Sequence, residues 1–379
     1  MSRAVTTYVN GRIFDGLHLR DGVCARFEDG VFIGLVLGNE ASAAGDIVDL
    51  QGDILSSGYV DLQVNGGGGV MFNDDPSVST LRTMASAHRG LGVTTFLPTL
   101  ITDDADTTTH AIAAAAEAIR VGLPGIAGLH LEGPHLSVAR KGAHDPDLIR
   151  PMNKSDLDQL LKAASLLPVL KVTIAPEAVT AAQVETLSKA GVIVSLGHTD
   201  AGFDTCLRYF AAGATCATHL FNAMSQLGSR EPGLVGAALA TETVSAGVIA
   251  DAVHVHPMSL KTAWAAKAGP GRIYLVSDAM AVAGTTKEKF CLGGRSVTRR
   301  NGVLTLADGT LAGADLDLTR AINVLHIQAG VGIADALCAA TSAPAEIAGL
   351  PNVALRPGET KLTDLNRISP TLSDLVPLG

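Results

Sequence analysis

Tryptophan and tyrosine are scarce in this chain, whose 379 residues include one Trp and four Tyr. Because proteins that bind single-stranded nucleic acid stack bases on aromatic side chains, this scarcity argues against such a function. An excess of positive charge is also lacking, since the formal net charge is −9. Polyanion binding draws its strength from clustered Lys and Arg, so nucleic acid is not an expected partner, although one small phosphate could still bind locally.

The chain also lacks the cysteine patterns of disulfide-rich or zinc-binding proteins. Its cysteines are scattered, odd in number and never spaced as CxxC, so neither a disulfide framework nor a cysteine zinc site is expected. Free thiols fit a reducing compartment, and the predicted location is the cytoplasm. The cysteines are Cys24, Cys206, Cys216, Cys291 and Cys338.

Long apolar runs are missing as well. No uninterrupted apolar stretch reaches the ~20 residues needed to span a bilayer. The first residues, MSRAVT, lack the basic segment and apolar core of an export signal. We therefore expect neither membrane insertion nor export.

The composition that is present describes a folded α/β enzyme. Apolar residues make up 47% of the chain and charged residues 17%, with 41 Gly and 16 Pro, unlike disordered or fibrous proteins. A length of 379 residues exceeds a usual single core. It fits one barrel of roughly 250 residues with a modest second unit, so two domains are expected.

Both ends of the chain favour a small β unit. Residues 5–57 carry short β-rich runs broken by Gly, Asp and Asn, which is typical of an antiparallel unit. The tail after residue 352 is again turn-rich and strand-like, so we expect it to return to the N-terminal strands. The predicted small domain consists of residues 1–57 and 350–379, and its first strands are 5–9, 22–27, 31–37 and 46–50.

Residues 58–349 alternate between apolar strands and Ala/Leu-rich helices, which predicts parallel βα units. Helices are expected, for example, at 155–166, 181–190 and 204–212. Eight parallel strands can close into a barrel. The expected strands are 59–64, 94–98, 125–131, 170–175, 192–197, 214–219, 244–249 and 272–277.

One stretch of the barrel region departs from the repeat. Residues 284–311 contain two strand-like runs with turn residues between them, which predicts a hairpin insertion after the eighth strand. A flap over the active site is one interpretation of it. Two further helices are expected at 316–328 and 333–348.

Polar residues follow the predicted strands with unusual regularity. Barrel enzymes place their chemistry where strands end and βα loops begin, so these residues are the candidates for function. We interpret Thr99 and Glu177 as merely solvated. In chain order the polar residues are Gln63 and Asn65, Thr99, Glu132, Glu177, His198, His219, Asp251 with His254, and Asp278.

Glu132, His198 and His219 form the strongest candidate set. Two imidazoles and one carboxylate suit a divalent ion such as zinc and leave a position open for water. A lone histidine would more often be structural. Three such residues at separate strand ends, each followed by small or turn residues, predict a metal site.

Asp278 completes the set at the last strand. A carboxylate there could take the proton of a water molecule acidified by the ion and pass it to a leaving amine. The alternative is a helix N-cap, a position that Asp favours. We favour catalysis.

Several motifs together resemble the N-acetylglucosamine-6-phosphate deacetylase family of the amidohydrolase superfamily. They are GYVDLQVNG at 58–66, HLEGPH at 130–135, SLGHT at 195–199, THLFNAM at 218–224 and VSDAM at 276–280. The resemblance spans nearly the whole chain. It implies a distorted (β/α)8 TIM-like barrel with a small β-sandwich domain, usually as a homodimer.

The resemblance also implies roles for individual residues. It assigns the metal to Glu132, His198 and His219, and the base and acid function to Asp278. It makes His144 the group that polarises the acetyl carbonyl. It implies substrate contacts at Ala143, Asn222, Ala223, Arg230, His254, Leu311, Ala312 and Gly313.

Arg230 and His254 suit a phosphate, because guanidinium binds phosphate through paired donors and imidazole can add another. From the residues alone, Arg230 would be interpreted as a surface loop charge. In the dimers that the family forms, it could reach the site of the other subunit.

Gln63 and Asn65 depart from the wider superfamily, in which the first strand ends in His-x-His and holds a second metal. Neutral amides are weak ligands for zinc, so we predict a single divalent ion per subunit. Zn²⁺ is the first expectation, with Fe²⁺, Mn²⁺ or Co²⁺ as alternatives.

The reaction that the resemblance implies is deacetylation of N-acetyl-D-glucosamine 6-phosphate to D-glucosamine 6-phosphate and acetate. One alternative is that the substrate is the galactosamine epimer or another N-acyl amino-sugar phosphate, since no residue can be assigned unambiguously to recognition of the C4 hydroxyl. The other is a barrel that has lost catalysis and serves as a binding or scaffold protein. The intact set of Glu132, His198, His219 and Asp278 argues against the last reading.

Overall fold

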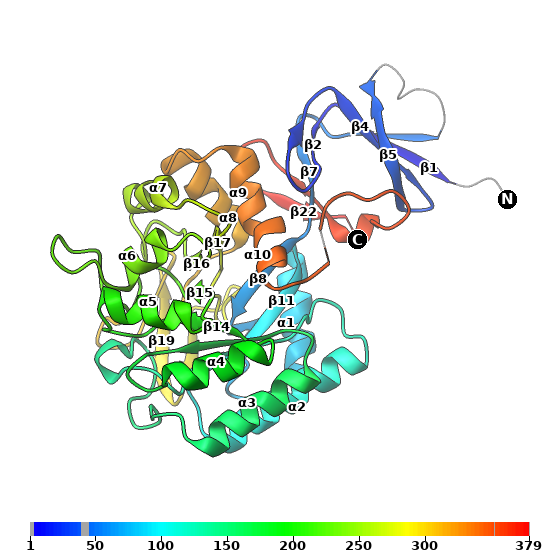
Figure 1. Cartoon of the computed structure of the whole chain (residues 1–379). Helices are drawn as coiled ribbons and strands as arrows, with labels where there is room; N and C mark the ends of the chain where they lie inside the picture. Colours follow the sequence, from blue (N-terminus) through cyan, green and yellow to red (C-terminus); the bar gives the residue numbers. More distant parts are fainter. Residues whose placement is uncertain (1–3, 39–44, 352, 379) are drawn as a thin grey trace.

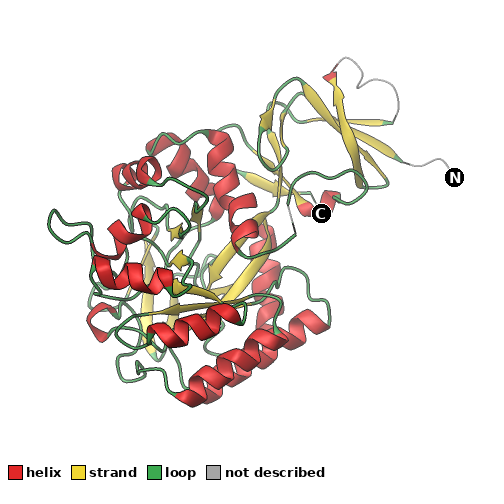
Figure 2. Ribbon diagram, in the orientation of Figure 1, coloured by secondary structure: helices red, strands yellow, loops and turns green. Residues whose placement is uncertain are grey.

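The computed structural model describes residues 4–38, 45–351 and 353–378, and these form a large and a small part (Figure 1). In the large part, helices surround a group of strands, whereas the small part consists mainly of strands (Figure 2). The first described strand and the last segment of the chain, blue and red in Figure 1, lie together at the small part.

Within the described residues, eight parallel strands form the sheet of the large part, in chain order around it. Its edges meet through a parallel bridge between Val64 and Ala279 and through the Asp278 N–H, which donates to the Gln63 carbonyl at 3.1 Å. The (β/α)8 barrel prediction is therefore confirmed, with its seam closed just after the last strand. The strands are β8 (Tyr59–Val64), β11 (Val93–Ile101), β12 (Leu129–Glu132), β13 (Leu170–Ile174), β14 (Ile193–Leu196), β15 (Cys216–Ala217), β16 (Ser245–Val248) and β17 (Ile273–Leu275).

Helices cover the outside of this barrel, and local capping fixes where several of them begin. Asn153 and Thr180 start α3 and α4 with reciprocal side-chain caps to Asp156 and Gln183. The helices are α1 (Val78–Gly90), α2 (Ala105–Arg120), α3 (Lys154–Leu166), α4 (Ala181–Lys189), α5 (Phe203–Ala211), α6 (Gly233–Ala240), α7 (Pro257–Ala266), α8 (Leu318–Asn323), α9 (Ile333–Ala340) and α10 (Ser342–Ile347).

The last predicted helices are each interrupted. The helix expected at 316–328 is α8 followed by a wider π-helical turn, Val324–Gln328. The helix expected at 333–348 divides into α9 and α10 at Thr341, whose φ of −130° and ψ of −86° are not helical. Neither break carries a Gly, so the composition of these segments gave no signal for it.

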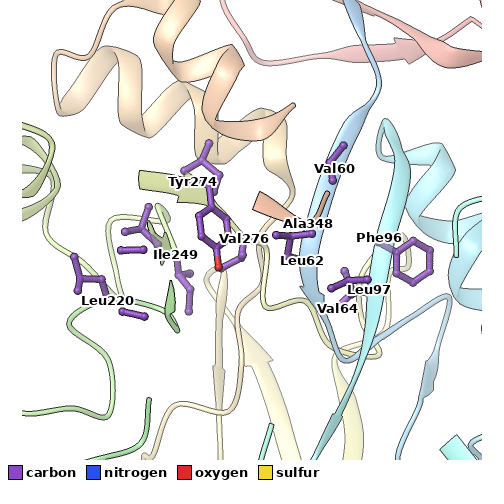
Figure 3. Packing of buried hydrophobic residues seen from close by; sticks show 14 of the residues in the cluster. Val60, Leu62, Val64, Phe96, Leu97, Leu220, Ile249, Tyr274, Val276 and Ala348 are labelled. Atoms are coloured by element: carbon purple, nitrogen blue, oxygen red, sulfur yellow. The ribbon is translucent and has the colours of Figure 1, made fainter. Parts of the chain in front are cut away.

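Strand β8 shows how the barrel separates packing from chemistry. Its side chains alternate, and Val60, Leu62 and Val64 belong to the main apolar cluster, part of which Figure 3 shows. Asp61 and Gln63 belong to the opposite set and bond to groups around Asp278. Each face of the strand is buried, but only one is apolar. Burial of an apolar side chain of this size contributes about 1.5–3 kcal/mol to folding.

Two sheets form the small part. One has the order β5-β4-β1-β6 and the other β22-β21-β7-β2-β3, and side chains from both, such as Tyr8, Phe27 and Leu55, share one cluster. The strands are β1 (Val5–Val9), β2 (Arg12–Phe14), β3 (Leu19–Arg20), β4 (Val23–Glu28), β5 (Val31–Leu37), β6 (Asp46–Asp49), β7 (Ile54–Ser57), β21 (Leu365–Ile368) and β22 (Leu375–Pro377).

The pairing in the small part differs from a purely antiparallel unit. Strand β1 pairs parallel with β6, and β2 pairs parallel with β7, so the expectation of an antiparallel unit is wrong there. The C-terminal strand β21 pairs with β7, which brings the tail to the N-terminal strands. The boundaries 1–57 and 350–379 stay a prediction, and residues 1–3, 39–44, 352 and 379 of that predicted domain lie outside the described residues.

The insertion at 284–311 is a sheet of three antiparallel strands in this fully described stretch, not a two-stranded hairpin. They are β18 (Lys289–Leu292), β19 (Arg295–Arg300) and β20 (Val303–Thr305). Strand β19, RSVTRR, was missed because its polar side chains give no apolar pattern. Leu292, Val297 and Leu304 pack against Met280, just beyond β17, so the insertion covers the carboxyl end of the barrel.

Among the described residues, no helix combines the length and apolar character that a membrane span requires.

Three buried histidines predict a loss of stability in acid. Burial lowers the pKa of His88, His130 and His135, so each stays neutral in the folded chain while the unfolded chain takes up a proton below the usual pKa of 6.5. Their contribution to stability is thus present above pH 6.5 and is lost as the pH falls toward the folded pKa values. Each of these three histidines should contribute about 1.4 kcal/mol per pH unit to this fall in the free energy of unfolding.

Urea unfolding followed between pH 7.5 and 5.5 measures this slope. His88→Gln removes one titrating group and should reduce the slope by about 1.4 kcal/mol per pH unit. His110→Gln is the matched control, because His110 is exposed and should leave the slope unchanged. Equal slopes for wild type and His88→Gln would contradict the assignment.

Candidate metal centre and active site

Three side chains converge at the carboxyl end of the barrel. Glu132 ends β12, and His198 and His219 follow β14 and β15 by two residues. The Nε2 atoms of the two histidines lie 3.1 Å apart, and Glu132 Oε1 lies 3.1 Å from His198 Nε2 and 2.9 Å from His219 Nε2. All three are buried, and they form the group of metal-ligand side chains found among the described residues.

The chemistry of these atoms fits a bound cation. The Nδ1 atom of His198 lies 2.8 Å from the Arg140 carbonyl, which can only accept, so Nδ1 carries the proton of the neutral ring. The lone pair of Nε2 then faces Glu132 Oε1. Atoms about 2.1 Å from one tetrahedral ion are about 3.4 Å apart, close to the separations found here. A divalent ion would therefore relieve the repulsion between these lone pairs.

The backbone is strained where the site residues leave their strands. The φ angles of His198, His219 and Asp278 are 48°, 31° and 48°, in the left-handed region that non-glycine residues rarely adopt. Such conformations cost on the order of 1–3 kcal/mol each and collect at functional sites. The residue types at these positions give no sequence signal for this backbone conformation.

Two amide side chains hold the Asp278 carboxylate. Its Oδ1 accepts hydrogen bonds from Gln63 Nε2 at 3.1 Å and from Asn65 Nδ2 at 2.7 Å. Gln63 Nε2 also lies 3.1 Å from Glu132 Oε2, so one amide bridges both carboxylates. Burial and the nearby charge of Glu132 raise the pKa of Asp278. Residue Ala279 pairs with β8 instead of starting a helix, so the N-cap alternative for Asp278 is wrong.

Asp61 bonds to the backbone on both sides of the barrel seam, next to Asp278. Its carboxylate accepts from the Ser277 N–H at 3.2 Å and from the Gln63 N–H at 3.1 Å, and so joins the first strand to the last. Burial raises the pKa of Asp61 to about 7. Asp61 could not be recognised from the sequence, because an Asp within a strand gives no pattern of its own.

His144 lies in the loop after the short turn η2 (Val138–Arg140), and its ring packs edge-on against His198, with 4.4 Å between centroids. Its Nδ1 contacts both the hydroxyl and the backbone N–H of Thr102. Burial, together with the neighbouring His198, lowers the pKa of His144 to about 3. The loop is also tied to the insertion, because the Arg295 guanidinium donates to the Ala143 carbonyl.

A cavity of about 400 Å³ opens above these residues. Six of the predicted substrate contacts line it: Ala143, Asn222, Ala223, His254, Leu311 and Gly313. The His254 Nδ1 lies 2.6 Å from Asp251 Oδ2, which orients the ring. The lining also includes Arg140, Ile249, Met280 and Leu292, which the sequence did not indicate.

Two predicted contacts lie elsewhere. Ala312 is buried in the insertion cluster, and its N–H donates to the Leu304 carbonyl at 3.2 Å. Arg230 lies exposed in a loop, outside the described residues that line the cavity.

The solvated interpretation holds for Glu177 and is wrong for Thr99. Glu177 is exposed and accepts from the Thr199 hydroxyl at 2.6 Å. Thr99 is fully buried and links the Val64 N–H to Nδ1 of His130, whose Nε2 bonds Thr173. His130 therefore belongs to a polar layer inside the barrel, below the metal-ligand group.

Comparisons with known proteins identify relatives of this chain. No family model matches the chain. The N-acetylgalactosamine-6-phosphate deacetylase of Shewanella sp. (strain ANA-3) is 42% identical over 338 residues, 89% of this chain and 85% of the relative. The N-acetylglucosamine-6-phosphate deacetylase of Haemophilus influenzae is 36% identical over 306 residues, 80% of this chain and 79% of the relative.

A solved structure extends the likeness to the whole fold. It is a mutant N-acetyl-D-glucosamine-6-phosphate deacetylase from Mycobacterium smegmatis in complex with N-acetyl-D-glucosamine 6-phosphate. Its TM-score is 0.89 at 29% identity, over 100% of this chain and 99% of that one. The chain belongs to the family of N-acetylglucosamine-6-phosphate and N-acetylgalactosamine-6-phosphate deacetylases, which are hydrolases.

Proposed function

We propose that this enzyme hydrolyses the acetamide of N-acetyl-D-glucosamine 6-phosphate, giving D-glucosamine 6-phosphate and acetate. The observation that carries the proposal is the position of Asp278, bridged through Gln63 to the ligand group of Glu132, His198 and His219 on the floor of a cavity. The names of the relatives and the complex of the mycobacterial enzyme support the substrate.

Glu132, His198 and His219 would hold the ion, which when bound lowers the pKa of a water molecule and so makes it a nucleophile near neutral pH. Asp278 would take a proton from the attacking water molecule as the C–O bond to the acetyl carbon forms. Because the two amides occupy Oδ1, Oδ2 is the oxygen available for this proton. The same carboxyl group then protonates the sugar nitrogen as the C–N bond breaks.

His144 stabilises the negative charge that develops on the acetyl oxygen. A neutral imidazole can donate a hydrogen bond through Nε2, and such a donor is commonly worth about 3 kcal/mol in the transition state. The low pKa of His144 keeps its ring neutral at the pH at which the enzyme works.

The phosphate would bind at the rim of the cavity. His254 is oriented toward it by Asp251, while Arg230, which lies outside the lining of its own cavity, would complete the site of a second subunit in a homodimer. Asn222, Ala223, the Ala143 backbone and the loop 311–313 would contact the sugar. Within that loop Leu311 and Gly313 line the cavity, whereas Ala312 is fully buried and lies outside the lining.

The galactosamine epimer is a second candidate substrate, because a relative at 42% identity is an N-acetylgalactosamine-6-phosphate deacetylase. Acetate release from both epimers, measured on one purified sample of known metal content, separates the two. Turnover of N-acetylglucosamine 6-phosphate with the higher kcat/KM is expected. A higher kcat/KM for the galactosamine epimer would replace the proposed substrate, and no release from either would favour a binding or scaffold function.

A single ion per chain is expected. Gln63 and Asn65 occupy the positions where a second ion would need imidazoles, and their amide groups donate to the carboxylates of Glu132 and Asp278. Metal analysis of the purified protein should give about one ion per chain. Two tightly bound ions per chain would contradict this. We propose Zn²⁺ as the ion, with Fe²⁺, Mn²⁺ or Co²⁺ as alternatives.

The five free thiols support our proposal that the enzyme acts in the cytoplasm. We also propose that the small β-sandwich comprises 1–57 and 350–379 and that 58–349 form the catalytic barrel. The pairing of β21 with β7 supports these boundaries.

A further inference from the structure

We propose that Thr102, the residue that follows β11, is a positioning residue that keeps the proton of the His144 ring on Nε2. The inference rests on the proposed function, in which that Nε2–H donates to the acetyl oxygen. It concerns the hydrogen bonds on the opposite side of the ring, at Nδ1.

The backbone N–H of Thr102 favours one tautomer of the His144 ring. It donates to His144 Nδ1 at 3.3 Å, and a backbone N–H cannot act as an acceptor. A proton on Nδ1 would face the proton of Thr102 across this long contact, which favours the tautomer in which Nδ1 presents its lone pair. In the neutral ring the single proton then lies on Nε2. No group among the described residues bonds this nitrogen, and His144 lines the cavity.

The hydroxyl of Thr102 strengthens the same arrangement. Its Oγ1 lies 2.7 Å from His144 Nδ1 and 3.5 Å from the Glu132 carbonyl. A hydroxyl has one proton, and the shorter distance assigns that proton to the imidazole. Nδ1 thus receives two donors from one residue.

The surroundings of this hydroxyl are closely fitted. Thr102 and His144 are both buried, with 5% and 4% of their surfaces exposed. Gly133 has a φ of +89°, and a Cβ there would lie 2.2 Å from Thr102 Oγ1. A glycine at this position therefore gives the hydroxyl the space that it occupies beside the imidazole.

The wrong tautomer would reverse the function of His144. With its proton on Nδ1, the ring would present a lone pair to the developing oxyanion, which repels negative charge. Substrate binding depends less on this donor than the transition state does, because the charge on the oxygen appears only during the reaction. A defect in Thr102 should therefore lower kcat more than it raises KM.

Thr102→Val removes the hydroxyl but keeps the size and the backbone N–H. We expect kcat to fall about tenfold with KM changed less than about threefold, and Thr102→Ser to restore kcat to within about threefold of wild type. In a His144→Gln background, Thr102→Val should cause no further loss, because the two residues act as one unit. Thr341→Val is the matched control, since it removes a buried hydroxyl that donates to the Leu337 carbonyl and does not line the cavity.

Nitrogen NMR of ¹⁵N-histidine-labelled enzyme reads the tautomer without turnover. The signals lost in His144→Gln identify His144, and they should show the Nε2–H form in wild type and a mixture with the Nδ1–H form in Thr102→Val. An Nδ1–H ring in wild type, or multiplicative effects of Thr102→Val and His144→Gln on kcat, would overturn the proposal. If wild type hydrolysed neither epimer, the proposed function would fail, whereas the NMR result would still decide the tautomer.

Discussion

Asp278→Asn is expected to lower kcat for acetate release by about 10³-fold or more. Loss of a general base commonly costs about 10²–10⁴-fold, and a large effect is expected here because one group serves both proton transfers. The amide is the same size as the carboxylate. Its oxygen can still accept the hydrogen bonds from Gln63 and Asn65, so the geometry around residue 278 should persist. It cannot take a proton from water at neutral pH.

The measurement compares turnover and metal content of wild type and variant. The variant should keep about one ion per chain, because Asp278 is separate from the proposed ligands. Asp158→Asn is the matched control, since Asp158 is an exposed carboxylate that pairs with Lys154 on α3. Near-normal turnover in Asp278→Asn would remove the assigned base.

The elements that the sequence predicted well are those whose pattern is dictated by burial on both faces. Strand β8 was predicted with its observed bounds because its apolar alternation lies between a Gly and an Asn. The polar residues at or just after the ends of β12, β14, β15 and β17 could be assigned to one site without coordinates, since the carboxyl ends of parallel barrel strands meet on one face.

The parts that sequence reasoning missed depend on backbone atoms or on distant partners. The carbonyl of Arg140 orients His198, yet any residue could supply a carbonyl at that position. Arg295 reaches the Ala143 carbonyl from 152 residues further along the chain, and the polar strand that carries it has no apolar period. Thr102 looks like any threonine after a strand, and only its distance to His144 gives it a function.

Short strands were missed for another reason. Strands β2 and β3 of the small part contain three and two residues, too few to show a period of two. The parallel pairing of β1 with β6 also has no local signal, because the residues of a strand do not specify the direction of its neighbour. Such features follow from how the two chain ends pack together.

Glu132→Gln is expected to abolish ion binding together with activity. Glu132 Oε1 is the atom that both imidazoles approach, and a neutral amide is a poor ligand for a divalent ion. In one orientation its NH₂ group would donate to the imidazole lone pairs and so occupy the atoms that would bind the ion. In the other it would face the NH₂ group of Gln63, which donates to Oε2 in the wild type. Loss of the ion removes several kcal/mol of transition-state stabilisation, so kcat should fall by at least about 10³-fold.

Chelation distinguishes a loss of activity caused by loss of the ion from one caused by unfolding. Wild type stripped of metal should lose activity and regain it when Zn²⁺ is added, whereas Glu132→Gln should remain inactive at the same Zn²⁺ concentration with unchanged secondary structure by circular dichroism. Glu185→Gln is the control, because Glu185 pairs with Lys189 on the surface of α4. A Glu132→Gln variant that holds one ion and turns over normally would place the ion elsewhere. Since Asp278→Asn keeps its ion and Glu132→Gln does not, the two variants together distinguish the residue that moves the proton from those that hold the metal.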